Sequence, residues 1–378
     1  MIESLGYLAL RLWPVWLALF GVLSLTAAFR GRLGAYGALV SGNVGRIGLS
    51  ICLFWLFAAL FADVVAPFTA GEQLLAMKLA SPGAIDPETG EIFVFGGDIL
   101  GRDVFSRMIY GSQVVLLIAP VATIFAMMVG ITLGLPAAYF GGFMDTVLSF
   151  LANMVLSFPV ILLFYILVTP GVQETSLPRV FSGILFLFPI IFVCLLFYTR
   201  YSLRPGLVTL QLLATLLVGG WIYAGLVFDA DPLGIVHISK NHLNIFVAVV
   251  FAVSPSVFRI VRGFTLEIKT KDYIAAAQTR GEGAWYIMLW EMLPNARGLL
   301  VTDICLRIGY TTILLGTLGY LGLGLASESP DWGTAIKDSG ALLRVYAHPA
   351  LPPVIALMSL VLGLNLLADA LREQAFRD

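Results

Sequence analysis

Charge is the scarcest property of this 378-residue chain. Charged residues make up only 12% of it, roughly half the share found in an ordinary soluble domain. Hydrophobic residues reach 59%, more than a chain of this length can bury inside itself in water. The composition therefore excludes a soluble protein and predicts an all-α integral membrane protein. The net charge of -1 says nothing about partners, because charge in a membrane protein matters by side rather than in total.

Cysteine is also scarce. The three cysteines, Cys52, Cys194 and Cys305, all fall within apolar runs, which argues against a disulfide framework or a metal site. No cleavable leader is indicated either, because the first apolar run, residues 5–29, is too long for a signal-peptide core and lacks a small-x-small cleavage site. We interpret that run as a retained helix.

The chain lacks the motifs of an enzyme. It contains no GxxxxGK[ST] loop, so it does not bind ATP by that motif. Its three histidines, His237, His242 and His348, lie in predicted outer loops without HExxH spacing, and we interpret them as solvated, with metal binding as the weaker alternative. Acids are sparse and mostly in loops. We therefore expect no catalytic site, no metal and no cofactor in this chain.

What the sequence has in abundance is long apolar segments. A bilayer core requires about 20 apolar residues per helix. Nine segments reach that length: 5–29, 46–67, 112–138, 146–168, 180–199, 207–227, 244–262, 298–323 and 350–370. The sequence thus predicts nine transmembrane helices, although the pair within 180–227 could instead form a re-entrant hairpin.

The distribution of Lys and Arg predicts the orientation. With the polar segment 262–297 in the cytoplasm, thirteen of these residues fall inside and seven outside. The inside set is Arg30, Arg32, Arg46, Arg200, Arg204, Arg259, Arg262, Lys269, Lys271, Arg280, Arg297, Arg372 and Arg377. The outside set is Lys78, Arg102, Arg107, Arg179, Lys240, Lys337 and Arg344. This predicts an outer N-terminus and a cytoplasmic C-terminus, with Arg11 near the outer end of the first helix as the exception.

Two outer loops are predicted to be structured. In the first, residues 84–95 place a Pro-Glu-Thr-Gly turn between short apolar runs, which favours a β-hairpin. Residues 101–112 then predict a helix lying in the interface on the outer side of the membrane. The second loop, 327–349, carries Trp332 and Tyr346, residue types that favour the interface.

The most informative segment is the polar island from Arg262 to Arg297 between two apolar runs. It predicts a short alanine-rich helix, KDYIAAAQTR, which Gly281 ends in a left-handed conformation. A second helix, AWYIMLWEML, is predicted to stop at Leu293-Pro294 before the next span. Without a partner the segment could be an amphipathic interfacial hairpin.

This island resembles the cytoplasmic EAA loop by which permease subunits of ABC importers engage their ATPases. The triplet is Ala275-Ala276-Ala277 here, followed by Gly281 and Leu293-Pro294 at the family's spacing. The resemblance implies that the first short helix fits a groove on an ATPase subunit. Its coupling residues would be Asp272, Tyr273, Ala275, Ala276, Ala277, Gly281, Leu293 and Pro294. Ala275 departs from the family, which has a glutamate at that position.

More of the chain resembles the oligopeptide, dipeptide and nickel branch of the same family. The matching motifs are GGDILGRDVFSRMIYGSQVVL (96–116), AAYFGGFMD (137–145), LSFP (156–159), LGYLGLG (318–324), SPDWG (329–333) and NLLADALRE (365–373). Phe150 and Asn153 replace an Arg and an Asp common in that branch. The resemblance implies a six-helix permease core. About three helices, namely the first and the 170–240 hairpin, are additions that face lipid or shield a partner interface.

The expected organisation has three parts. Residues 1–67 form two N-terminal helices, 68–111 form the outer (periplasmic) loop, and 112–378 form the permease domain with the 170–240 hairpin and the coupling loop 263–297. Glycines such as Gly130 and Gly134 are expected to let helices pack closely.

Two charges are expected within a span, Asp303 and Arg307 at i, i+4. Charges at membrane depth usually face a bundle interior or an aqueous path. The pair is either a polar patch on the translocation path or an intrahelical pair that satisfies itself near the cytoplasmic end.

The resemblance implies a permease of the bacterial inner membrane that works by alternating access. The expected partners are a second, homologous permease forming a heterodimer, two ATPase subunits that hold ATP and Mg, a periplasmic or lipid-anchored substrate-binding protein and membrane lipid, with no nucleic acid. Peptides are the expected cargo, with opines, glutathione-like conjugates, peptide antibiotics and nickel complexes as alternatives. A secondary transporter would need midplane charges or matched broken helices, and a membrane enzyme would need clustered acids or histidines. The sequence offers neither.

Overall fold

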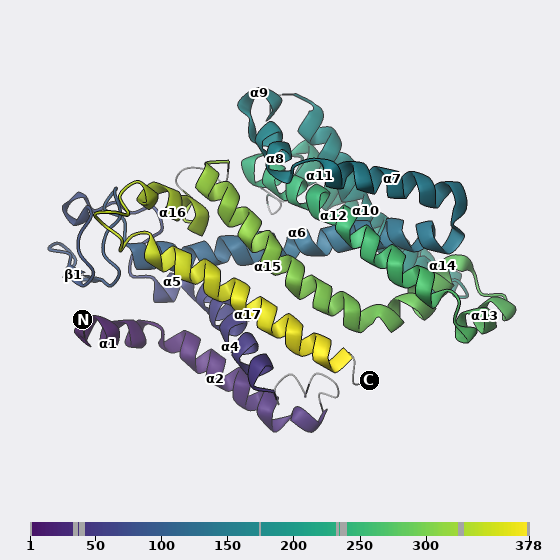
Figure 1. Cartoon of the computed structure of the whole chain (residues 1–378), viewed down its shortest axis with the longest axis horizontal. Coiled ribbons are helices and arrows are strands. Elements are labelled where there is room, and N and C mark those ends of the chain that lie inside the picture. The colour runs from purple at the N-terminus through teal and green to yellow at the C-terminus, as the bar shows by residue number, and fades with distance from the viewer. Residues whose placement is uncertain are drawn as a thin grey trace. The chain divides into compact units, whose positions relative to one another are not determined.

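The computed structural model describes residues 2–32, 42–173, 175–231, 240–323 and 329–375, together with residues 37 and 234. Within these residues, helices dominate, and the one sheet is a short antiparallel strand pair. It forms two compact units: residues 1–120 with 301–378, and residues 121–300. Each unit is described by itself below, with the elements labelled in Figure 1.

Unit 1 combines the beginning and the end of the chain. Its elements are α1 (Ile2–Arg11), α2 (Trp13–Ala28), η1 (Arg30–Arg32), α4 (Asn43–Leu60), α5 (Ala62–Val65), η2 (Leu75–Met77), β1 (Ala84–Ile85), β2 (Ile92–Phe93), the start of α6 (Val104–Phe140), most of α15 (Arg297–Leu321), α16 (Trp332–Gly340) and α17 (Leu351–Ala375).

Unit 2 contains the middle of the chain. Its elements are the rest of α6, α7 (Gly142–Ser157), α8 (Val160–Val168), α9 (Pro170–Gln173), α10 (Leu177–Tyr201), α11 (Pro205–Phe228), α12 (Lys240–Ile268), α13 (Asp272–Thr279), α14 (Ala284–Tyr286), η3 (Ile287–Met292), η4 (Leu293–Ala296) and the first turn of α15.

Long apolar helices confirm the prediction of an all-α membrane protein. Within the described residues, seven helices are long and apolar enough to cross a bilayer, and an eighth span is counted if the bent pair α7–α8 crosses it. The hairpin α10–α11 supplies two of the seven, so each of its helices is long enough to span. The shorter apolar helix α2 corresponds to the remaining predicted segment.

Two predicted spans are broken by proline. The first helix was expected to run unbroken over 5–29, but it divides at Leu12 into α1 and α2, with Pro14 in the first turn of α2. The segment 146–168 bends by 82° between α7 and α8. Phe158 takes extended backbone there, because the residue before a proline avoids the helical region.

Helix α17 packs against α4 in unit 1 through glycines on both helices. A Cβ added at Gly48 would lie 2.7 Å from the backbone nitrogen of Leu367, and one at Gly363 would lie 2.8 Å from the side chain of Ile51. Nearby, Trp55 donates a 2.9 Å hydrogen bond to Ser359 and meets Trp332 edge-on at 5.0 Å. The core of this unit therefore depends on contacts between the first and last thirds of the chain.

In unit 2 the glycines of α6 let α12 approach closely. A Cβ at Gly130 would lie 2.4 Å from the Val257 side chain and 2.9 Å from the backbone nitrogen of Phe258. A Cβ at Gly134 would lie 2.9 Å from Val261. The expectation that these two glycines mediate close helix packing is confirmed.

The predicted hairpin in the first outer loop is formed, since Ala84 pairs with Phe93 and Ile85 with Ile92. Arg11 at the end of α1 makes a 2.5 Å ion pair with Glu91 of this hairpin. The arginine that departs from the predicted distribution of charge therefore has a carboxylate partner in the hairpin. This contact places the end of α1 beside the hairpin.

The separate interfacial helix expected over 101–112 is wrong. Residues 104–112 are the first turns of the 37-residue helix α6. Both the apolar Phe105 and Ile109 and the polar Ser106 and Arg107 are buried. An interfacial helix needs one polar face in water, whereas this segment is enclosed on all sides by packing and polar contacts.

Candidate functional site

The short helix α13 carries the predicted coupling residues, and it begins and ends as the sequence indicated. Asp272 lies in its first turn, where an acidic side chain favours the helix dipole. At its end Gly281 has φ +79°. The amide of Gly281 donates to the Gln278 carbonyl at 2.9 Å and that of Glu282 to the Ala277 carbonyl at 3.2 Å. These two bonds make a Schellman motif, which requires a left-handed residue and so favours glycine.

Helix α13 has one buried face and one exposed face. Ile274 and Ala277 are fully buried, whereas Asp272, Tyr273, Ala275 and Ala276 are exposed. The exposed face presents two methyl groups and little else near its centre, so another surface can approach its backbone closely.

Ala277 was predicted to be part of that partner-facing surface, and the structure places it in the interior instead. Residues three apart share a helix face, so Ala277 follows Ile274 into the packing of unit 2. The small side chain at 277 therefore serves packing within the chain.

The prediction that Leu293-Pro294 stops the second helix is wrong. The helix runs without interruption from Ala284 to Leu321. It widens into a π turn over Ile287–Met292 and tightens into a 3-10 turn over Leu293–Ala296. Proline lacks the amide that an α-helix needs and its ring crowds the preceding turn, and these local changes of helix type accommodate both effects. The segment after Gly283 is therefore helical throughout and continues into α15.

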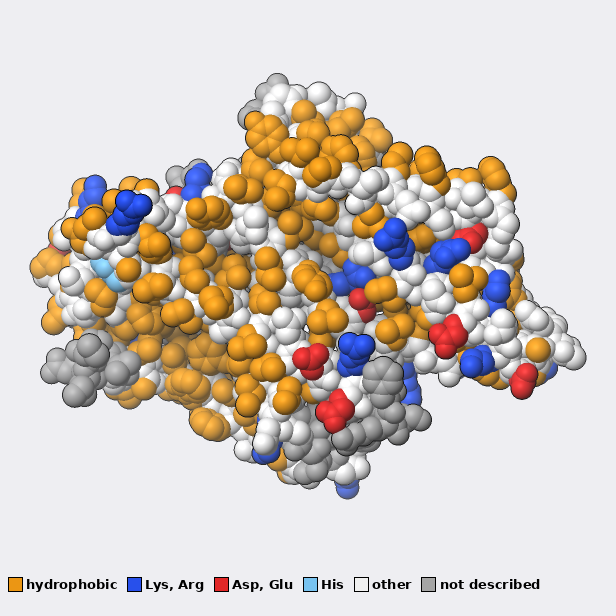
Figure 2. Space-filling model, in the orientation of Figure 1, with side chains coloured by type: hydrophobic (Ala, Val, Ile, Leu, Met, Phe, Trp, Pro, Cys, Tyr) orange, Lys and Arg blue, Asp and Glu red, His pale blue; other side chains and the backbone are white. Residues whose placement is uncertain are grey.

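Polar contacts tie the segment around α13 to the end of α6. Gln278 donates to the Tyr139 hydroxyl at 3.2 Å, and the Lys269 ammonium donates to the Ala138 carbonyl at 2.9 Å. Figure 2 shows acidic and basic side chains gathered over the part of unit 2 that leads to α13, whereas apolar side chains dominate around α8. These side-chain contacts connect α13 and the residues just before it to the end of α6.

Helices α7 and α12 are joined by two arginines. Arg262 makes a bidentate pair with Asp145, with distances of 2.5 and 2.7 Å. One turn away, Arg259 donates to the side-chain oxygen of Asn153 at 2.7 Å. Asn153, one of the two departures from the branch pattern, therefore keeps a partner, whereas Phe150 is 65% exposed.

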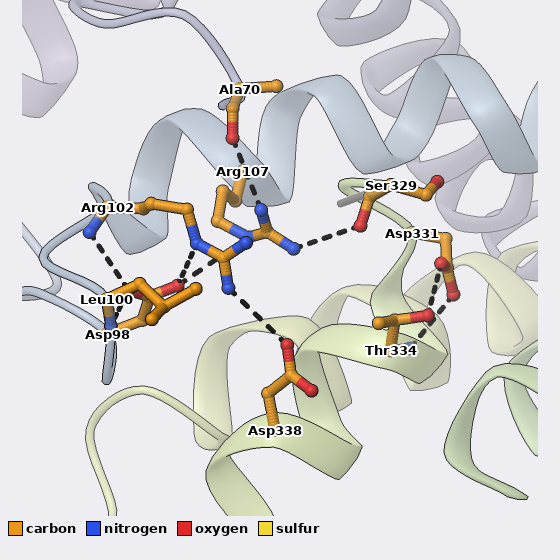
Figure 3. A network of polar contacts seen from close by, with 9 residues as sticks. All are labelled: Ala70, Asp98, Leu100, Arg102, Arg107, Ser329, Asp331, Thr334 and Asp338. Atoms are coloured by element: carbon orange, nitrogen blue, oxygen red, sulfur yellow. Dashed lines mark hydrogen bonds and ion pairs between the residues drawn. The ribbon is translucent and has the colours of Figure 1, made fainter. Parts of the chain in front are cut away.

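A second cluster of polar residues lies in unit 1, where the motif at 96–112 meets SPDWG (Figure 3). Asp98 accepts from the amides of Leu100 and Arg102 and pairs with the Arg102 guanidinium at 2.6 Å. Arg102 also reaches Asp338 at 3.4 Å. Arg107 donates to the backbone carbonyl of Ser329 at 3.0 Å.

Trp332 completes the junction. It is fully buried, and its indole donates to the Met108 carbonyl at 2.9 Å. A Cβ at Gly111 would lie 2.5 Å from the indole, so only glycine fits there. The two motifs, which lie far apart in the sequence, thus form one packed structure, which we call the outer cap after the side of the membrane that the sequence predicts for it.

Burial disfavours the charge of two acids in the outer cap, Asp103 and Asp331, and raises the pKa of both carboxyls. Burial raises the pKa of the Asp103 carboxyl to about 6, and the nearby Asp98 adds to the shift. The Oδ2 atom accepts from the amide and hydroxyl of Ser106, at 2.9 and 2.7 Å, and so caps α6. The Oδ1 atom is buried without a hydrogen-bond partner.

Asp303 and Arg307 form the intrahelical pair that the sequence indicated, 2.5 Å apart in α15. Both side chains are largely buried, with exposures of 12% and 10%. The pairing fits the interpretation in which the two charges neutralise each other, and a role on the translocation path stays a prediction.

No group of three metal-ligating side chains occurs in the residues that the structure describes. His237 lies outside those residues.

Comparison with known proteins identifies the class. Residues 130–376 match the family model of the binding-protein-dependent transport system inner membrane component. The match covers well over half of the chain, so the protein belongs to this family, and it is a multi-pass inner membrane permease component of an ABC importer.

Similar curated proteins are permease subunits. The chain is 27% identical to the glutathione transport system permease protein GsiD of Pectobacterium atrosepticum over 74% of this chain and 70% of that protein. It is 24% identical to the dipeptide transport system permease protein DppC of Alkalihalophilus pseudofirmus, covering 90% and 87%. It is 26% identical to the di/tripeptide transport system permease protein DppC of Pseudomonas aeruginosa, covering 88% and 87%.

Proposed function

We propose that this permease translocates peptides or peptide-like solutes. The names of its relatives, dipeptide, di/tripeptide and glutathione permeases, support that cargo class. All three classes share a peptide bond between free termini, so a path for one suits the others. Opines, nickel complexes and peptide antibiotics are the alternative cargoes.

Helix α13 is the contact to an ATPase subunit in this proposal. The observation that carries it is the exposed face of α13, in which Ala275 and Ala276 offer close approach, backed by fixed links to α6. Closure of two ATPases around ATP and Mg would push α13, and the continuous helix from Ala284 would carry the push into α15. Ala275 offers no carboxylate for a salt bridge, so packing must carry the coupling.

The partners follow from the same proposal. A second, homologous permease would complete the translocation path, and a substrate-binding protein would dock on the outer face, where the outer cap offers a rigid surface. The chain would act with its N-terminus outside and its C-terminus in the cytoplasm. The excess of Lys and Arg on the side of 262–297 and the contact of Arg11 with Glu91 support this orientation.

The first experiment is gentle purification of the tagged chain from its native host and identification of the proteins that elute with it. Recovery of a second permease and ATPase subunits is expected. A chain that elutes alone and transports without ATP in liposomes would refute the proposal in favour of a secondary transporter.

The α13 contact is tested by Ala276→Arg, with Ala28→Arg at the end of α2 as the matched change at another exposed position. A bulky charge at 276 is expected to abolish ATP-driven peptide uptake while leaving membrane insertion intact. The Ala28 variant should retain uptake. Normal uptake by the Ala276 variant would disprove the contact.

A further inference from the structure

The π turn η3 holds two neighbouring side chains that bind different elements. Glu291 accepts a 2.9 Å hydrogen bond from Arg280 at the end of α13. Trp290 donates a 2.9 Å hydrogen bond to Thr199 near the end of α10. The turn therefore connects the coupling helix on one side to the α10–α11 hairpin on the other. π turns within helices occur frequently at functional positions.

The Trp290 indole is held from two directions. Thr199 is 6% exposed, and its hydroxyl donates to the Leu195 carbonyl at 2.7 Å while accepting from the indole. The hydroxyl is thus satisfied as donor and as acceptor, which fixes its orientation. The Arg200 guanidinium lies 4.8 Å from the centre of the indole ring, within range of a cation–π interaction.

The opposite part of α10 is anchored in the body of unit 2. Phe186 meets Phe125 of α6 edge-on at 5.6 Å and stacks on Phe246 of α12 at 5.7 Å. Thr199 lies thirteen residues further along the same helix, about 20 Å at 1.5 Å per residue. Helix α10 therefore spans from an aromatic anchor on α6 and α12 to the π turn.

We propose that Thr199 and Arg200 are positioning residues of the coupling segment, and that the α10–α11 hairpin is a brace. The brace holds the π turn against the body of unit 2 through Trp290, and thereby sets the position from which α13 moves. Its mechanical role rests on the proposed coupling function of α13. The hairpin is then neither a passive lipid-facing addition nor a shield, because the end of α10 binds the π turn through Thr199 and Trp290.

The test compares variants of the full chain in the complex that it purifies with. Thr199→Val keeps the shape and removes the acceptor, and Thr199→Ser keeps the hydroxyl. Thr209→Val is the matched control in the same hairpin, because the exposed Thr209 hydroxyl donates to the Pro205 carbonyl of its own helix at 2.8 Å. Amide exchange of residues 287–296 and the amount of dipeptide transported per ATP hydrolysed in proteoliposomes are measured for each.

Thr199→Val is expected to speed amide exchange in 287–296 by roughly fivefold, the factor that corresponds to one lost hydrogen bond. Transport per ATP should fall by a similar factor, while Thr199→Ser and Thr209→Val match the unsubstituted chain. Unchanged exchange in Thr199→Val would overturn the brace. Faster exchange with unchanged transport per ATP would overturn its role in coupling.

Two further points keep the test decisive. If Thr199→Val is not recovered from the membrane, Trp290→Phe replaces it, because Phe keeps an aromatic ring beside Arg200 and lacks the N–H. If the unsubstituted chain purifies without an ATPase, the proposed coupling function fails by that result alone. The exchange comparison then still decides whether the hairpin braces the π turn.

Discussion

Replacement of Asp103 by Asn should remove a pH-dependent loss of stability from the outer cap. The carboxyl is 2% exposed, and burial raises its pKa from 3.8 to about 6. A raised carboxyl pKa means that the folded chain binds a proton that the unfolded chain releases. The contribution of Asp103 to the stability of the natural chain therefore falls as pH rises from about 4 to about 6, and it is constant above that window.

The magnitude follows from the size of the shift. A difference of about two pKa units corresponds to about 3 kcal/mol of unfolding free energy. The natural chain loses this contribution of the Asp103 carboxyl as pH rises from about 4 to about 6. Asn retains an acceptor for the amide of Ser106 and does not titrate. The Asp103→Asn variant should therefore gain stability relative to the natural chain as pH rises from 4 to 6.

The assay is thermal unfolding of the full chain in detergent between pH 4 and pH 8, with the two proteins compared at each pH. Glu88→Gln, a matched loss of an exposed carboxyl in the hairpin turn, serves as control and should show no such trend. A difference between the Asp103 variant and the natural chain that stays constant over the whole range would refute the reasoning. So would a difference of the opposite sign.

Two packing predictions accompany this one. Gly130→Leu should cost at least about 2 kcal/mol of stability, because its Cβ would meet Val257 at 2.4 Å. The control is Gly220→Leu, where nothing lies within 4 Å of the added Cβ, and thermal unfolding of that variant should change little. An equal effect at both positions would contradict the argument. Trp332→Phe should lower the unfolding temperature through a loss of about 1 kcal/mol, because the fully buried indole of Trp332 loses its hydrogen bond to the Met108 carbonyl; an unchanged unfolding temperature would show that this bond does not stabilise the outer cap.

The sequence by itself determined the features that depend on local physics. Composition and segment length indicated a helical membrane protein, because an unpaired backbone cannot cross lipid. The helix over 272–279 and its end at Gly281 follow from short-range rules, since a left-handed residue terminates a helix wherever it occurs. The hairpin over 84–93 was predictable from its turn residues for the same reason.

Only the tertiary structure decided what depends on residues far apart in the chain. Arg107 and Ser329 meet across 222 residues of sequence, and no periodicity reveals such a pair. Pro294 was expected to stop a helix, yet the helix continues because its neighbouring turns change type. Ala277 carries the same side chain as Ala276 but is buried, because the side of a helix that faces the protein is chosen by its packing partners. Neighbouring residues determine the local preference for a backbone conformation, whereas the burial and pairing of side chains depend on the folded chain.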